Sequence, residues 1–225
     1  MIARLVIQTI VWLAIMGGLL FAAAGTLAWP AAWLFLLEVG VLGIGAGVWL
    51  ARRDPALLAE RLSLFVQPAQ TRWDKIFMAS AGVSWLAWLV LMGIDGARLH
   101  RDAMPLWLNA GGALAIVICI VATCAVFRAN SYAAPVIKIQ AERGHTVSDT
   151  GPYAYVRHPM YSAAILFLVG LPLMLGSWWG LACVPLLIAG LGYRAVLEER
   201  TLMTGLDGYA NYAARVRYRF VPHVW

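Results

Sequence analysis

Charged residues are scarce in this sequence. Asp, Glu, Lys and Arg together make up 12% of the 225 residues, whereas soluble domains carry about 25%. Hydrophobic residues make up 62%, and the mean hydropathy is +0.77. This composition excludes a disordered chain and a soluble globular core, and it predicts an integral membrane protein. The length suits one domain covering residues 1–225.

Cysteine is almost absent. Cys119, Cys124 and Cys183 each lie within an apolar run, and no pair has the spacing of a zinc site or a redox motif. We therefore expect no metal centre, and we expect the three thiols to behave as small buried hydrophobes.

Acidic residues are outnumbered by basic ones, 11 to 17, so the formal net charge is +6. A basic chain can bind nucleic acid, but here the Lys and Arg residues flank hydrophobic segments. Anionic lipid headgroups attract basic residues at that position. The expected partners are therefore membrane lipids and not nucleic acid.

Long apolar runs are what the sequence has in quantity. A helix needs about 20 apolar residues to cross a bilayer, and this predicts an all-α polytopic transmembrane bundle of five to six spans. The first apolar run, 5–28, is too long for the core of a signal peptide, so we expect it to be retained as a span. The predicted spans are 5–28, 31–51, 76–94 and 106–127, followed by a short hairpin formed by 162–176, which contains Pro172, and a last run ending near residue 197.

The distribution of Lys and Arg predicts the orientation of the bundle. With a cytoplasmic N-terminus, fifteen of these residues fall on the cytoplasmic side and only Arg98 and Arg101 on the other. Such an excess is typical of cytoplasmic segments. It predicts cytoplasmic termini and a cytoplasmic site.

Two features depart from the simple alternation of spans and loops. The connection 53–75 is amphipathic, with Leu57, Leu58, Leu62 and Phe65 at roughly helical spacing, and is predicted to lie in the membrane interface.

Glu38 falls inside the second span, where a carboxylate is costly. A structural hydrogen bond, with Arg194 as one candidate partner, is favoured over a role in binding substrate.

The segment 140–161 concentrates polar and aromatic residues between apolar runs. Gly151-Pro152 predicts a turn, and Pro159 suits the first position of the helix that follows. His158 then lies at the helix cap, where free N–H groups favour an anionic ligand. A Pro-capped helix with interfacial Arg and Tyr anchors explains the same residues equally well.

A second cluster of polar residues lies at the C-terminal end of the last span. Arg194 and Glu198 are four residues apart and share one helix face, and Glu199 follows. Ionisable groups at this depth usually face a partner or a watery site, although an interfacial salt bridge is a comparable explanation. The tail beyond predicts a short helix with Tyr209 and Tyr212 on one face, which can cover the site.

Taken together, these motifs resemble a known family. Arg143-Gly-His145-x-Val147, Gly151-Pro-Tyr153-x-x-Val-Arg157-His158-Pro-x-Tyr161, Arg194-x-x-x-Glu198-Glu199 and Tyr209-x-x-Tyr212 are similar to the isoprenylcysteine carboxyl methyltransferase family, which is grouped with membrane phospholipid methyltransferases. The resemblance covers about residues 130–222. The run Asp54-Pro55-x-Leu-Leu-Ala-Glu60-Arg61 resembles bacterial members of the family, and this resemblance implies the inner membrane of a bacterium.

The resemblance implies the cofactor S-adenosyl-L-methionine, with S-adenosyl-L-homocysteine as its product. It divides the chain into a four-helix part, 1–127, and a catalytic part, 128–225. It implies that Arg194 contacts the methyl acceptor, and Glu199 is the candidate base if that acceptor is an amine. The implied cofactor-binding residues are Gln140, His145, Thr146, Val147, Ser148, Tyr153, His158, Pro159, Met160, Tyr161 and Glu198.

The expected activity is methyl transfer to the carboxylate of a lipophilic, prenylcysteine-like acceptor. A carboxylate is already ionised at neutral pH and needs orientation rather than a base. The alternatives are N-methylation of a phospholipid headgroup, a steroid-reductase-like enzyme using a nicotinamide cofactor, and a non-catalytic transport or assembly protein.

Overall fold

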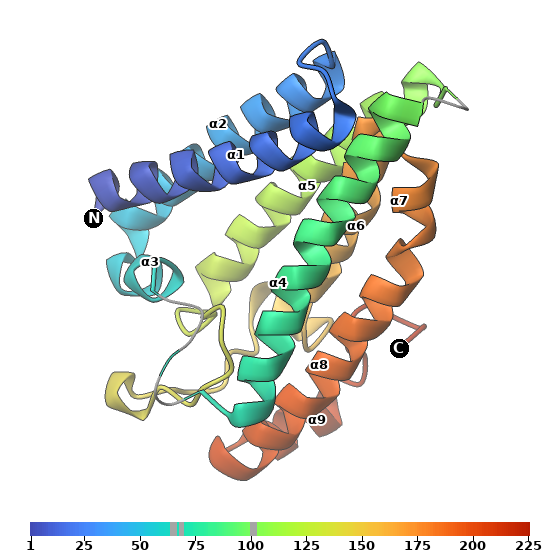
Figure 1. Cartoon of the computed structure of the whole chain (residues 1–225). Helices are drawn as coiled ribbons and strands as arrows, with labels where there is room; N and C mark the ends of the chain where they lie inside the picture. The colour runs from blue at the N-terminus through green and yellow to red at the C-terminus, as the bar shows by residue number, and fades with distance from the viewer. Residues whose placement is uncertain (64–66, 68–69, 100–102) are drawn as a thin grey trace.

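The chain folds into a bundle of long helices with a short helical tail (Figure 1). The computed structural model describes residues 1–63, 67, 70–99 and 103–225, and these residues contain no strand. The helices are α1 Ile2–Ala24, α2 Pro30–Arg53, α3 Pro55–Arg61, α4 Arg72–Gly93, α5 Leu106–Ala129, α6 Pro159–Leu175, α7 Trp178–Ala182, α8 Val184–Gly205 and α9 Tyr209–Arg215.

Five segments are long and apolar enough to cross a membrane, and the all-α polytopic prediction is confirmed. The segments are Ile2–Ala24, Pro30–Arg53, Arg72–Leu99, Leu106–Ala129 and Trp178–Gly205. The third includes a π-helical turn at Ile94–Leu99. The remaining apolar helix, α6, has only 17 residues and continues through Pro172 until Gly176 ends it in a left-handed conformation.

The last span is longer than predicted. The expected end near residue 197 is wrong, because α8 continues to Gly205. Glu198 and Glu199 stay helical and have partners on α6 and the tail. Charged residues are good helix formers, and ion pairing removes the cost of carrying them beyond the apolar run.

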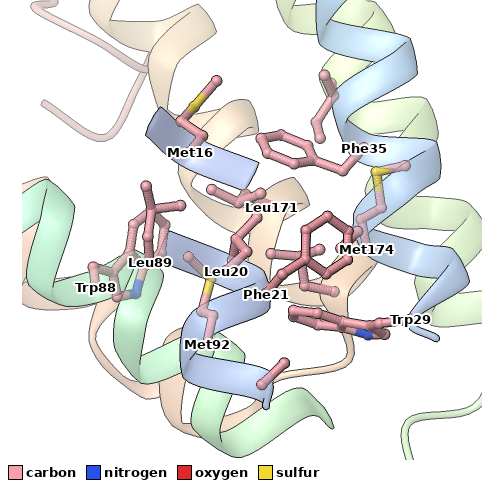
Figure 2. Packing of buried hydrophobic residues seen from close by; sticks show 14 of the residues in the cluster. Met16, Leu20, Phe21, Trp29, Phe35, Trp88, Leu89, Met92, Leu171 and Met174 are labelled. Carbon is pink, nitrogen blue, oxygen red and sulfur yellow. The ribbon is translucent and has the colours of Figure 1, made fainter. Parts of the chain in front are cut away.

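The main core fills the half of the bundle remote from the polar segment 140–161. Figure 2 shows Leu20 of α1, Phe35 of α2, Leu89 of α4 and Leu171 of α6 meeting there. All four side chains are fully buried. Their contacts fix the spans relative to one another, while the polar ends of α4, α6 and α8 remain available for a site.

Helices α5 and α6 approach each other very closely. A Cβ atom added at Gly112 would lie 2.5 Å from the Gly170 carbonyl oxygen, and one at Gly170 would lie 2.7 Å from the Gly112 carbonyl oxygen. Glycine alone fits at both positions. The short α6 is thereby held against a full-length span.

The helical part of the 53–75 connection, α3, packs on the protein, and its predicted place in the membrane interface stays a prediction. Asp54 Oδ1 caps α3 by accepting the Leu57 N–H at 2.9 Å. Leu57 and Leu58 are buried against Leu5 and Leu50 of α1 and α2. An apolar helix face can bury itself against lipid or against protein, and here it packs on protein. Phe65 lies outside the described residues.

The expected hydrogen bond of Glu38 is also absent from the described part of the chain. Its Oε1 atom is buried and has no hydrogen-bond partner there. Arg194, the candidate partner, pairs with Asp74 instead.

Candidate active site

The site is built around the start of α6. His158 is the N-cap and Pro159 the first helical residue, as predicted. The Arg157 and His158 backbone N–H groups donate to the carbonyl oxygens of Tyr218 and Arg219, each at 2.9 Å. These two bonds join the end of the chain to the cap, so the tail becomes part of the site.

The loop before α6 is folded on itself around Gln140. The fully buried Gln140 side chain donates from Nε2 to the Tyr132 carbonyl oxygen at 2.9 Å and accepts a hydrogen bond from Arg143. The His145 ring stacks on Tyr132 with the ring centroids 4.4 Å apart. Burial, with the nearby Arg143 charge, lowers the pKa of His145, so its imidazole is neutral at pH 7.

A cavity of about 100 Å³ opens between this loop, α6, the end of α8 and α9. Its lining includes residues of four separate elements, which the sequence places up to 82 positions apart. The lining residues are Asn130, Tyr132, Ala133, Ala134, Val136, Ile137, Lys138, His145, Thr146, Val147, Ser148, Tyr153, Arg157, His158, Met160, Tyr161, Glu198, Leu202, Leu206, Tyr209 and Tyr212.

The structure brings most of the predicted cofactor-binding residues together around this cavity. The predicted residues in its lining are His145, Thr146, Val147, Ser148, Tyr153, His158, Met160, Tyr161 and Glu198. Gln140 and Pro159 do not line it: Gln140 supports the loop from behind, and Pro159 is buried at the start of α6. The assignment of the whole set to a cofactor remains a prediction.

The tail forms one wall of the cavity, in keeping with the predicted tyrosine face of α9. Tyr209 and Tyr212 are both buried, and the Tyr212 hydroxyl donates to the Tyr153 carbonyl oxygen at 2.9 Å. Burial raises the pKa of Tyr212 to about 12. Both phenols are therefore neutral hydrogen-bonding groups at physiological pH.

The two adjacent glutamates have different environments. Glu198 lines the cavity and accepts a hydrogen bond from the Tyr161 hydroxyl at 2.7 Å. Glu199 is buried and faces three cationic or imidazole groups: Arg157 Nε at 2.7 Å, His158 Nε2 at 3.0 Å and Arg219 Nη2 at 2.9 Å. Glu199 therefore ties the start of α6 and the tail to α8 and does not line the cavity.

Arg194 lies next to the cavity but not in its lining. Its Nε donates to Asp74 Oδ1 at 3.1 Å, and its Nη2 donates to the Pro135 carbonyl oxygen at 2.8 Å. The guanidinium lies over the rings of Phe77 and Tyr161, 5.6 and 5.9 Å from their centroids. Tyr161 lines the cavity, so Arg194 is in contact with the cavity wall.

Asp74 is a functional candidate that the sequence does not reveal. It is completely buried in the first turn of α4 and also accepts the Gln70 side-chain N–H at 2.7 Å and the Ile137 backbone N–H at 3.1 Å. It thus joins α4, the cavity loop and Arg194. Ile137 and Arg194 lie 63 and 120 residues away from it in the sequence, so no local pattern indicates that it joins them.

Part of the chain that builds this site is similar to a known protein family. Residues 107–206, from α5 to the end of α8, match the family model described as phospholipid methyltransferase. No curated protein matches the chain significantly. The fold is similar to the solved structure of the eukaryotic intramembrane Ras methyltransferase ICMT (isoprenylcysteine carboxyl methyltransferase) without a monobody. That match has a TM-score of 0.56 and 17% identity, and covers 95% of this chain and 74% of that one. Residues 107–206 are thus similar to the phospholipid methyltransferases, and the chain shares its fold with ICMT.

Proposed function

We propose that this protein transfers a methyl group from S-adenosyl-L-methionine to the carboxylate of a lipophilic, prenylcysteine-like acceptor. The observation that carries the proposal is that the Arg194 guanidinium lies over both Tyr161, which lines a polar cavity, and Phe77, which lines an apolar groove. A water-soluble donor suits the cavity, and a lipid suits the groove.

The cavity lining combines charged, polar and aromatic groups, which an amphiphilic cofactor needs. Glu198 supplies a carboxylate for hydroxyl or ammonium groups, and the loop 145–148 supplies backbone and side-chain polar groups. Tyr153, Tyr209 and Tyr212 supply aromatic surface. S-adenosyl-L-methionine, when bound, supplies an activated methyl group on a cationic sulfur.

The groove has a volume of about 640 Å³ and lies between α4 and α8. Small residues on α4, such as Ser80 and Ala81, and Gly190 on α8 make room for it. At one end it is lined by Phe77 and Leu191, close to Arg194 on the next turn of α8. Apolar ligands fit lining of this kind, so the groove supports a hydrocarbon-bearing acceptor.

The neighbouring charges favour a carboxylate acceptor over an amine. An amine must lose a proton before or during attack, and the predicted base, Glu199, is already engaged by Arg157, His158 and Arg219. A carboxylate needs only to be held in line with the methyl group, and Arg194, which lies over Phe77 at the end of the groove, can hold it. Its orientation is fixed by Asp74.

N-methylation of a phospholipid headgroup is the second candidate, because the family model that matches residues 107–206 is the phospholipid methyltransferase model. Glu198, which lines the cavity, is then the available base. The two reactions leave chemically different products, and this allows a direct test.

The test is a labelled-methyl assay with the purified protein and a membrane lipid extract. The carboxylate proposal predicts label in the lipid fraction that is released as methanol by mild base, because esters are base-labile. Label that stays non-volatile after base treatment, in the phospholipid headgroup, would support the amine alternative. Incorporation no higher than in a heat-inactivated control would contradict both.

A further inference from the structure

A second cavity, of about 260 Å³, lies between α1, α2 and the end of α3. It adjoins the proposed methyl-transfer site, because Arg61 lines it and also contacts Ala133 and Met160 of the methyl-transfer cavity. It is at the same end of the bundle as that site, because α3 and the C-terminal end of α2 lie there (Figure 1). One part of its lining is polar and includes Gln8 and Arg61. The apolar part consists of Leu5, Trp12, Leu13, Met16, Val39, Gly43 and Leu62.

Arg61 carries a charge that no carboxylate neutralises among the described residues. Its Nη1 donates to the Ala133 carbonyl oxygen at 2.9 Å and contacts Met160 Sδ at 3.7 Å, and its guanidinium lies 4.6 Å from the Phe127 ring centroid. Nε and Nη2 make no hydrogen bond to a described residue. The adjacent Glu60 is paired with Lys138 at 2.8 Å.

Burial lowers the pKa of Arg61 to about 10, so the group remains charged at neutral pH. A partly desolvated guanidinium without a counter-ion is unfavourable, and an anion on the free Nε–Nη2 edge removes that cost. That edge matches two oxygens of a phosphate or a carboxylate.

We propose that this cavity binds one anionic phospholipid of the surrounding bilayer, with its phosphate on Arg61 and an acyl chain along α1 and α2. The polar and apolar parts of the lining match the two parts of such a lipid. Arg4, whose guanidinium donates to the Leu62 carbonyl oxygen, adds a second positive charge near the same end of α1. Two cations favour a lipid of net negative charge over a zwitterionic one, whose headgroup also presents an ammonium.

The test is native mass spectrometry of delipidated protein titrated with phosphatidylglycerol or phosphatidylcholine. The wild type is expected to bind one phosphatidylglycerol about tenfold more tightly than phosphatidylcholine, the effect of one charge-assisted contact. Arg61→Gln should abolish the preference, whereas Arg61→Lys should retain part of it. Equal binding of the two lipids by the wild type would overturn the proposal.

Two glycines of α2 make a matched pair that does not depend on Arg61. A Cβ atom at either Gly43 or Gly45 meets no atom within 4 Å, but only Gly43 lines the cavity. Gly43→Leu should therefore reduce tight phosphatidylglycerol binding by about tenfold through loss of space for the chain, while Gly45→Leu should not. Equal binding by both variants would overturn the assignment of this cavity, even if Arg61→Gln fails to fold.

Discussion

At the scale of single residues, the site depends on two buried carboxylates that hold cations in place. Asp74 fixes Arg194, and Glu199 fixes Arg157, His158 and Arg219. Neither carboxylate lines the cavity. Their contacts indicate that these two carboxylates hold other side chains in position and do not bind a ligand themselves.

Replacing Arg194 by Ala, or Asp74 by Asn, is expected to lower methyl transfer on the order of 100-fold, because a poorly oriented acceptor reacts slowly. Affinity for S-adenosyl-L-homocysteine should change little, since neither side chain lines the cavity. Turnover of the folded variants and calorimetric titration measure the two effects.

If Asp74 acts through Arg194, methyl transfer by the variant carrying both Asp74→Asn and Arg194→Ala should be no slower than methyl transfer by Arg194→Ala alone. Independent, multiplying effects of the two substitutions would show that Asp74 does not work through Arg194. A loss of cofactor affinity equal to the loss of turnover would assign Arg194 to the cofactor.

Glu199→Gln should destabilise the protein by about 3 kcal/mol, because it leaves buried cations without a counter-ion. Thermal unfolding in detergent checks this. Glu142→Gln serves as the control, since Glu142 is exposed on the loop and should leave the melting temperature unchanged. An unchanged melting temperature for Glu199→Gln would contradict the structural role of that carboxylate.

At the scale of elements, the proposed acceptor site depends on the space between α4 and α8. Gly190 offers a way to close it, since a Cβ atom there meets nothing within 4 Å and the residue lines the groove. Gly82 on α4 is equally unobstructed but does not line it. The two glycines form a matched pair.

Gly190→Phe is expected to reduce methyl transfer to a long-chain acceptor by about tenfold, the result of overfilling an apolar site. Transfer to a short-chain acceptor and binding of S-adenosyl-L-homocysteine should persist. Gly82→Phe should behave as wild type in the same labelled-methyl assay. Equal activity of the two variants on long-chain acceptors would exclude the groove as the chain-binding site.

Elements differ in how far the sequence predicts them. The spans follow from apolar length, and the start of α6 follows from Pro159 after His158, because both signals are local. The position of α3 could not be predicted from its amphipathic pattern, which suits lipid and protein surfaces equally. The end of α8 was missed because the partners of Glu198 and Glu199 lie on other elements.

The same distinction applies to the site. His145, Tyr153 and Tyr161 were indicated by a resemblance in motif, and the fold brings them to one cavity. Asp74 was missed, because its role depends on a contact with Arg194 that only the packing of α4 against α8 and the loop creates.

At the scale of the whole molecule, two ligands of opposite solubility would reach one point from different sides. The polar cavity opens among the loop, α6 and the tail, while the apolar groove lies between two spans. The bundle carries its long polar loop and its folded tail at one end, and the polar cavity lies between them (Figure 1).

The central claim is that the polar cavity binds S-adenosyl-L-methionine, and calorimetric titration of the purified protein with S-adenosyl-L-homocysteine tests it most directly. Saturable one-site binding is predicted, weakened about tenfold or more by Glu198→Ala, which removes a charged hydrogen-bonding group from the cavity. Arg194→Ala should bind like the wild type. Absence of binding by the folded wild type, together with saturable binding of NADPH, would contradict the account.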